Sequence, residues 1–470
     1  MTIAASHHRP EDSPSLKKSL RIRGIEPREQ GRRSEGVLST YTAVETVSRD
    51  WILVLLPTAL AIKTFYTGAS ETVRLLVIGC FVLVNGLLVA VAYLRKTETR
   101  FSVEYGPLIL IFGASALVLS RPSGIHNVFI FGLIFALTIR LSQTVDARVI
   151  MVSIVDGLGL YAVANVVGYL AGLRSPLEGI RTGLDAGGAT RIIFPLSQSI
   201  NLPPVLAAMY IVAFCWLVRE HGSLRRFSRL ICLFAAAIVL IGSGSRVAMA
   251  TALIFVVISL LLPAAPRVVA PVLAVLASIS ALILPMLLEA TRTILEPFLT
   301  LISNRRDVHH SIAALNGRDY IWERSLNFWV EEVNGFVNAV LGYGLQGHYK
   351  SGASLTYYNL MANAIRRDPE KLVGMHNSYL QQLYDGGLLG WGFLTLAILW
   401  ASVRVAGRVH IWRGYAVMAS GIFCVILACS MTEVLLNPNA NVLTFWVLVI
   451  LVGAVCQSAA VQQSESGDSR

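Results

Sequence analysis

The chain has 470 residues, of which 55% are hydrophobic and only 14% are charged. Soluble domains carry about a quarter charged residues, so this composition, with a mean hydropathy of +0.63, predicts a polytopic membrane protein. The net charge of +11 would suggest nucleic acid as the partner of a soluble protein. Here it lies largely in a terminal segment and in short loops, where membrane topology explains it better.

The N-terminal segment, residues 1–49, mixes Pro, Ser and Gly with many basic residues. It has neither an apolar core pattern nor a small-residue cleavage site. We therefore predict a disordered cytoplasmic tail and not a signal peptide. A solvated tail that fixes orientation is favoured over a tail that binds anionic lipid, although both fit the basic composition.

Twelve apolar runs follow, and we expect each to be a membrane-spanning helix, several being shorter than the roughly 20 residues of an untilted span. They lie near residues 51–68, 74–94, 107–120, 127–142, 149–172, 201–218, 230–243, 247–263, 268–288, 388–405, 415–431 and 441–457. The expected fold is thus all-α, with nine spans within residues 50–288, a large polar loop over 289–387, three spans within 388–457 and a short tail over 458–470.

Basic residues predict the orientation of these spans. If the N-terminal tail is cytoplasmic, the basic short loops, which carry for example Arg95, Arg148, Arg229 and Arg408, are cytoplasmic too. This assignment satisfies the positive-inside rule, and its mirror image contradicts it. The segments 173–200 and 289–387 are then extracytoplasmic, and both termini are cytoplasmic.

The stretch that closes the large loop is His376-Asn377-Ser378-Tyr379-Leu380. Apolar residues from Ser378 to Tyr384 recur at helical spacing, which predicts a short amphipathic helix at the membrane surface. Its polar side would consist of Gln381, Gln382 and Asp385, and Gly386-Gly387 would end it before the next span. An imidazole at the start of such a helix lies where a lipid-linked substrate presents its reactive end. We therefore expect His376 to be a catalytic base, in competition with His348 of the same loop.

Arginines on the predicted outer side are more numerous than topology requires, and guanidinium groups bind phosphate with fixed, bidentate geometry. Arg246 follows Gly242 to Ser245 between two apolar runs with almost no loop, so its charge lies at or near the outer surface. Both a substrate-facing cation and a snorkelling interface anchor explain it. Arg318 follows Gly317 at the start of a helical stretch, where a structural ion pair with Asp319 or a nearby residue and a ligand contact are equally good interpretations.

Neither a metal nor another cofactor is indicated by the sequence. His309-His310 have no carboxylate at a useful spacing and are expected to be solvated. The six cysteines all fall in apolar segments, so neither a disulfide framework nor a thiolate site is expected.

Together these pieces resemble the O-antigen ligase and polymerase superfamily of bacterial membrane glycosyltransferases. The matching residues are Ser245-Arg246, Gly317-Arg318 with Trp322, Gly342-Tyr343-Gly344, His376 to Leu380 and Gly387-Leu388-Leu389-Gly390. Arg191, followed by Phe194 to Asn201, resembles the family's arginine before a Phe-x-x-x-Asn-like segment, although the Gly-containing version of that segment is missing.

The resemblance implies transfer of a glycan from a polyprenyl diphosphate carrier to a hydroxyl of a glycan, lipid or protein acceptor, on the outer side of the bacterial inner membrane. It implies His376 as the base, and Arg246, Arg318 and Arg191 as donor-binding residues. Arginines would stabilise the charge that develops on the diphosphate without a metal ion. An unperturbed imidazole is largely neutral near pH 7 and can accept the acceptor's proton, and attack opposite the leaving group inverts the anomeric centre.

A secondary transporter or a flippase for lipid-linked glycans is the alternative from another class. It too would have about twelve spans, but it would be expected to place ionisable residues near the middle of the membrane, often in related repeats. This chain concentrates them outside the spans. Within the enzyme class, the sequence does not separate a ligase from a polymerase.

Overall fold

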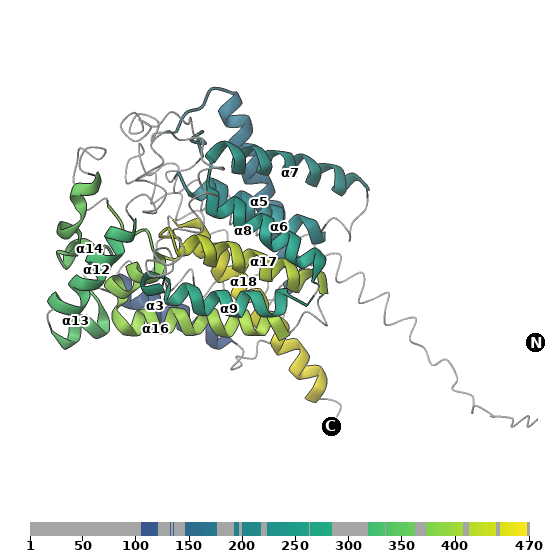
Figure 1. Ribbon diagram of the computed structural model, residues 1–470. Coiled ribbons are helices and arrows are strands. Elements are labelled where there is room, and N and C mark those ends of the chain that lie inside the picture. Colours follow the sequence, from purple (N-terminus) through teal and green to yellow (C-terminus); the bar gives the residue numbers. More distant parts are fainter. Residues whose placement is uncertain are drawn as a thin grey trace, which may run out of the picture. The chain divides into compact units, whose positions relative to one another are not determined.

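The computed structural model describes residues 105–120, 132, 135, 146–175, 192–196, 200–217, 223–262, 264–283, 318–333, 335–361, 373–407, 413–438 and 442–467. All of them lie within residues 45–470, one of the two units into which the chain divides. Every regular element among the described residues is a helix (Figure 1). The all-α prediction is therefore confirmed for this part of the chain, whereas the predicted tail over 1–49 lies outside it.

Nine of the twelve predicted spans coincide with helices. These are α3 (Gly106–Ser120), α5 (Ala147–Leu170), α6 (Leu202–Leu217), α7 (Ser223–Ser243), α8 (Arg246–Leu261), α9 (Pro266–Ser278), α16 (Ser378–Gly407), α17 (Arg413–Ser430) and α18 (Leu443–Gly467). The runs near 51–68 and 74–94, and nearly all of 127–142, lie outside the described residues. Within the described residues, α5, α7 and α16 contain stretches long and apolar enough to cross a membrane, and the other six are shorter apolar helices. Twelve crossings therefore stay a prediction.

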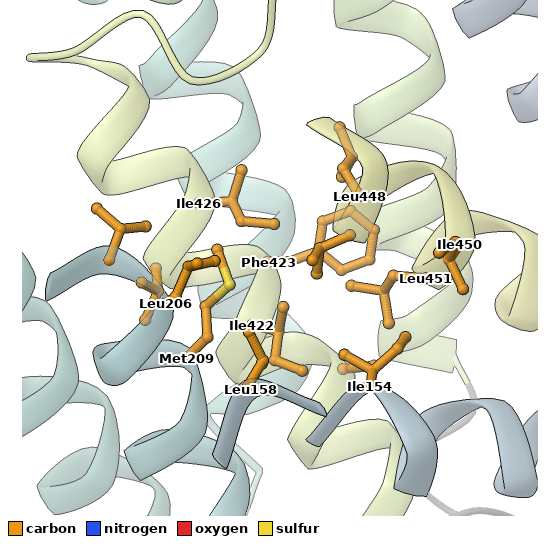
Figure 2. Packing of buried hydrophobic residues seen from close by; sticks show 14 of the residues in the cluster. Ile154, Leu158, Leu206, Met209, Ile422, Phe423, Ile426, Leu448, Ile450 and Leu451 are labelled. Carbon is orange, nitrogen blue, oxygen red and sulfur yellow. The ribbon is translucent and has the colours of Figure 1, made fainter. Parts of the chain in front are cut away.

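Four helices, α5, α6, α17 and α18, build the interior of the bundle. Figure 2 shows fully buried aliphatic and aromatic side chains from all four packed together, with Phe423 of α17 among Leu448, Leu451 and Ile422. By contrast, α7 presents Phe227, Phe234 and Ile241 outward with exposures of 64%, 70% and 70%. Exposed apolar area costs about 25 cal/mol per Å² in water, and a hydrocarbon surrounding removes that cost. The exposed face of α7 is thus that of a lipid-facing helix.

One basic residue differs from its expected setting. Arg229 was predicted to lie in a short loop, but α7 begins six residues earlier, at Ser223. Its side chain is buried, and its Nε lies 3.1 Å from Oδ1 of Asp156 on α5. The charge is paired inside the bundle because α5 and α7 pack against each other.

The large polar loop has a core of its own. Its described part contains α12 (Arg318–Glu332), α13 (Phe336–Leu341), α14 (Gly347–Lys350) and two 3-10 turns, η6 (Ala353–Thr356) and η7 (Tyr358–Met361). A second apolar cluster joins α12 and η6 to the start of α16, and its largest buried side chains include Trp322, Tyr357 and Tyr384. α12, α13 and α14 accordingly gather at the N-terminal end of α16 (Figure 1).

The expected break after the His376 stretch occurs at Gly387, where α16 has a non-helical residue with φ 66° and ψ −169°. Such a break frees the carbonyl groups of the preceding turn. The carbonyls of Tyr384 and Asp385 accept hydrogen bonds from the backbone N–H groups of Tyr343 and Gly344, both at 2.8 Å. A Cβ atom on Gly387 would overlap the backbone of Gly342. The two glycine motifs therefore meet backbone against backbone.

The prediction of an exposed polar side on the first part of α16 is wrong. Gln381, Gln382 and Asp385 are only 3%, 2% and 0% exposed. The sequence pattern is amphipathic, but the large loop and the segment after α17 pack over the polar side. These three residues therefore lie inside the protein, not at a membrane surface.

Candidate functional site

Glu433 lies in the segment between α17 and α18 and joins two residues singled out by the sequence. Its Oε1 forms an ion pair with Nη2 of Arg318, and its Oε2 lies 3.3 Å from Nδ1 of His376. The three side chains are 14%, 20% and 25% exposed for Glu433, Arg318 and His376. The group is mostly enclosed, yet a part of His376 can be reached from outside.

The side chain of Asn377 fixes the backbone directly after His376. Its side-chain Oδ1 accepts hydrogen bonds from the backbone N–H groups of Tyr379 and Leu380, both at 3.0 Å, and so caps α16. Its Nδ2 donates to the carbonyl of Met431 at 3.0 Å. One amide thus starts the helix and holds the first residue of the segment after α17 beside it.

Ser378 fixes the segment that carries Glu433. Its hydroxyl donates to the carbonyl of Glu433 at 2.7 Å and accepts from the N–H of Leu435 at 2.8 Å. His376 itself adopts φ 49°, in the left-handed region that residues other than glycine rarely occupy. Such a conformation persists where the surroundings determine it, and here the bonds of Asn377 and Ser378 fix the chain directly after the histidine.

Arg318 is the first residue of α12, and two buried contacts hold that helix in place. Nε1 of Trp322 donates to the carbonyl of Met375 at 2.9 Å, and the hydroxyl of Tyr384 donates to the carbonyl of Ser325 at 2.6 Å. Trp322 is one helical turn beyond Arg318, so the buried indole directs the guanidinium towards the chain next to Met375. The ion pair considered for Arg318 was with Asp319 or a nearby residue, and the pair that the structure contains is instead with Glu433, 115 residues further along the chain.

The electrostatics of the site keep Glu433 ionised. Burial by itself raises the pKa of a carboxyl group, but the hydrogen bond and charge of His376, the charge of Arg318 and a hydrogen bond from Asn201 together lower the pKa of Glu433. Asn201 stands directly before α6. Residues from three segments that are distant in sequence therefore converge on one carboxylate, which a fourth segment carries.

The remaining predicted residues lie as follows. Arg246 is the first residue of α8 and is exposed. Arg191 lies outside the described residues, but the next residue, Ile192, donates from its N–H to the carbonyl of Gly242 at 2.8 Å. The segment after Arg191 thus adjoins the end of α7, close in sequence to Arg246. A joint role of these arginines with Arg318 stays a prediction.

The two competing histidines have different surroundings. His348 is 5% exposed, and its Nδ1 lies 3.0 Å from Nε2 of Gln381. His376 keeps a quarter of its side chain exposed and has a carboxylate partner. A base must reach its substrate, so these surroundings favour His376.

A metal ion has no ready-made ligand set in the part of the chain that the structure describes, because no three His, Cys, Asp or Glu side chains are grouped to hold one there. His309-His310 lie outside the described residues. The group that does form, with one guanidinium, one imidazole and one carboxylate, is suited to binding an anion and moving a proton.

Sequence reasoning missed Glu433 and Asn201. A signal for Glu433 was present, since it is the sole acidic residue between Asp385 and Glu465 and stands between two apolar runs. A lone ionisable residue at a span end suggests a functional contact. Its partners could not be read from the sequence, because Arg318 is 115 residues away.

Part of the chain matches a known protein family. Residues 231–395 match the family model described as O-Antigen ligase. The matched stretch includes Arg246, Arg318 and His376, whereas Glu433 and Asn201 lie outside it. No curated protein matches the chain.

Proposed function

The family match supports the O-antigen ligase and polymerase superfamily, and from this premise we propose that the chain transfers a glycan from a polyprenyl diphosphate carrier to an acceptor hydroxyl. The transfer takes place on the extracytoplasmic side of the bacterial inner membrane. The observation that supports it best is the junction of His376, Glu433 and Arg318. In this junction an imidazole and a guanidinium, which we propose as the base and the phosphate-binding cation, contact one carboxylate.

In this proposal His376 is the general base. With a carboxylate at Nδ1, the neutral ring carries its proton on Nδ1 and leaves Nε2 as the acceptor. Nε2 takes the proton of the acceptor hydroxyl while the oxygen attacks the anomeric carbon. Glu433 then faces an imidazolium, whose positive charge it stabilises. A positioned base of this kind contributes about 10²- to 10⁴-fold to the rate.

Arg318 binds the leaving group. As the bond between the anomeric carbon and the diphosphate oxygen breaks, its electron pair goes to the diphosphate, and a fixed cation stabilises that charge. The ion pair with Glu433 involves Nη2, and a guanidinium carries five N–H donors. Arg246 and Arg191 are proposed to bind the same donor. Because guanidinium groups supply the charge, transfer is proposed to be metal-independent. Because the acceptor oxygen attacks the anomeric carbon opposite the leaving group, transfer is proposed to invert the anomeric centre.

The proposed sidedness agrees with contacts that join segments far apart in sequence. Arg318, His376 and Glu433 belong to three segments that the sequence assigns to the outer side, and the N–H of Leu345 donates to the carbonyl of Val118 at the predicted outer end of α3. A cysteine in place of Ser351 should react with an impermeant thiol reagent on intact spheroplasts, whereas one in place of Ser223 should not. The reverse pattern would contradict the orientation.

The central test uses purified protein in lipid vesicles with a defined polyprenyl-diphosphate-linked glycan and an acceptor. We expect transfer in excess chelator, and a fall of about 10²- to 10⁴-fold for His376→Ala with donor binding retained. Glu323→Gln on the exposed side of α12 is the control and should keep full activity. Absence of transfer by the wild type, together with movement of the intact donor across the membrane, would instead indicate a flippase.

Ligase and polymerase are separated by the glycans of a deletion strain. Acceptors that carry a single repeat and no long chain indicate loss of a polymerase. Full-length chains that accumulate on the carrier indicate loss of a ligase.

A further inference from the structure

Asp385 is a fully buried carboxylate that the proposed chemistry does not use. It lies on α16 and is 0% exposed. Its Oδ1 accepts hydrogen bonds from the backbone N–H of Gly347 at 2.6 Å and from Nε2 of Gln381 at 2.8 Å, and its Oδ2 accepts from Nδ2 of Asn437 at 3.3 Å. Burying a charge without hydrogen-bond partners is very costly. A residue at this position must therefore accept hydrogen bonds from these three donors.

The donor from Asn437 connects Asp385 to the catalytic group. Asn437 stands four residues after Glu433 in the segment 431–438 between α17 and α18. Asn377 and Ser378 hold this segment from Met431 to Leu436, and Asn437 holds it near its end. Glu433 lies within the stretch that these bonds hold. Loss of the Asn437 bond would release the C-terminal end of that stretch.

The other donors connect Asp385 to the large loop. Gly347 begins α14, and Gln381 shares its Nε2 between Asp385 and Nδ1 of His348. One carboxylate therefore joins α14, α16 and the segment of Glu433. This arrangement explains why the polar side of the first part of α16 is buried.

We propose that Asp385 is a positioning residue, which holds Asn437 and thereby keeps Glu433 in contact with His376 and Arg318. The expected effect of Asp385 on glycan transfer rests on the proposed function. The anchoring itself can be measured without any transfer assay.

The polarity of the Asp385–Asn437 hydrogen bond gives a directional test. Asn437→Asp removes the N–H donor to Oδ2 of Asp385 and places a second acidic group beside it. Adding Asp385→Asn restores one donor and one acceptor, so the swapped pair should work again. Asp385→Asn alone should be mild, because Oδ1 of Asn437 is buried without a partner among the described residues and can accept from the new amide after the Asn437 amide rotates.

The experiment compares these variants as purified full-length protein by two readouts. The first is kcat and KM for transfer from the polyprenyl-diphosphate-linked donor, and the second is hydrogen exchange of residues 431–438. Asn437→Asp should lower kcat about tenfold or more with donor KM little changed, and should speed exchange in this segment. The swapped pair should recover both to within a few-fold. Asn327→Asp, the same change at an exposed position of α12, is the control and should alter neither.

Failure of the swapped pair to recover, or unchanged exchange in Asn437→Asp, would overturn the positioning role. If Asn437→Asp does not accumulate, Asn437→Ala removes the donor without adding a charge, and it must speed exchange in the segment for the proposal to stand. A wild type that transfers no glycan would reject the proposed function, whereas the exchange data would still decide the anchoring.

Discussion

Replacing Glu433 by Gln tests the link between the base and its carboxylate. The change keeps the length of the side chain and removes its negative charge. It weakens the contact with Nδ1 of His376, and it ends the ion pair with Arg318. We therefore expect a lower kcat, because His376 loses the group that orients it and stabilises its protonated form.

The size of the loss follows from the contact that is removed. A hydrogen bond to a charged group contributes about 1.5–3 kcal/mol, and about 1.36 kcal/mol corresponds to a tenfold change in rate. This predicts a fall in kcat of about 10- to 150-fold. The Nδ1–Oε2 distance of 3.3 Å exceeds the roughly 2.7–2.9 Å of strong charge-assisted bonds, so the lower half of the range is expected. Donor affinity should be unchanged or increased, because Arg318 no longer shares its charge with Glu433.

The assay measures initial rates of transfer at matched protein in vesicles, with donor concentration varied to separate kcat from KM. Glu433→Asp, which keeps the charge but shortens the side chain, should lie between the wild type and Glu433→Gln. Glu323→Gln controls for loss of a carboxylate elsewhere on the same side. Full kcat in Glu433→Gln, alongside an inactive His376→Ala, would refute the idea that this carboxylate supports the base.

Three further outcomes are expected. Arg318→Lys should lose most transfer activity despite keeping its charge, since an ammonium lacks the bidentate geometry for a diphosphate. The matched control Arg324→Lys, also on α12, should keep its activity. Equal transfer rates of the two variants would contradict this prediction. Because the pKa of Glu433 is lowered below its usual 4.5, its stabilising effect is present above about pH 4.5 and lost as pH falls through the lower folded value. The difference in Tm between wild type and Glu433→Gln should thus shrink as pH falls below about 4.5; a difference that grows in stronger acid in a thermal unfolding assay would be incompatible with this direction. Gly387→Ala should greatly reduce the yield of folded protein, because its Cβ would overlap the backbone at Gly342. Gly392→Ala in the same helix has open space around the new Cβ and should be tolerated. Detergent size-exclusion chromatography measures the folded fraction of both variants.

The sequence by itself determined the membrane class, the helical fold and the location of nine of the expected helices, because a lipid-facing helix must be apolar over most of its length. It also indicated His376 and Arg318 as candidate site residues, since an imidazole after a polar loop and an arginine at a helix start are unusual local signals. The break at Gly387 was predicted too, because paired glycines interrupt a helix.

Only the tertiary structure decided which residues meet. Amphipathic spacing predicted a surface helix with a wet polar side, but Gln381, Gln382 and Asp385 are buried because separate segments pack over them. Glu433 joins Arg318 and His376 across sequence separations of 115 and 57 residues. Periodicity reports the faces of one helix and carries no information about which distant segment covers them, so the carboxylate at the centre of the site emerged only when α12, α16 and the segment after α17 were placed together.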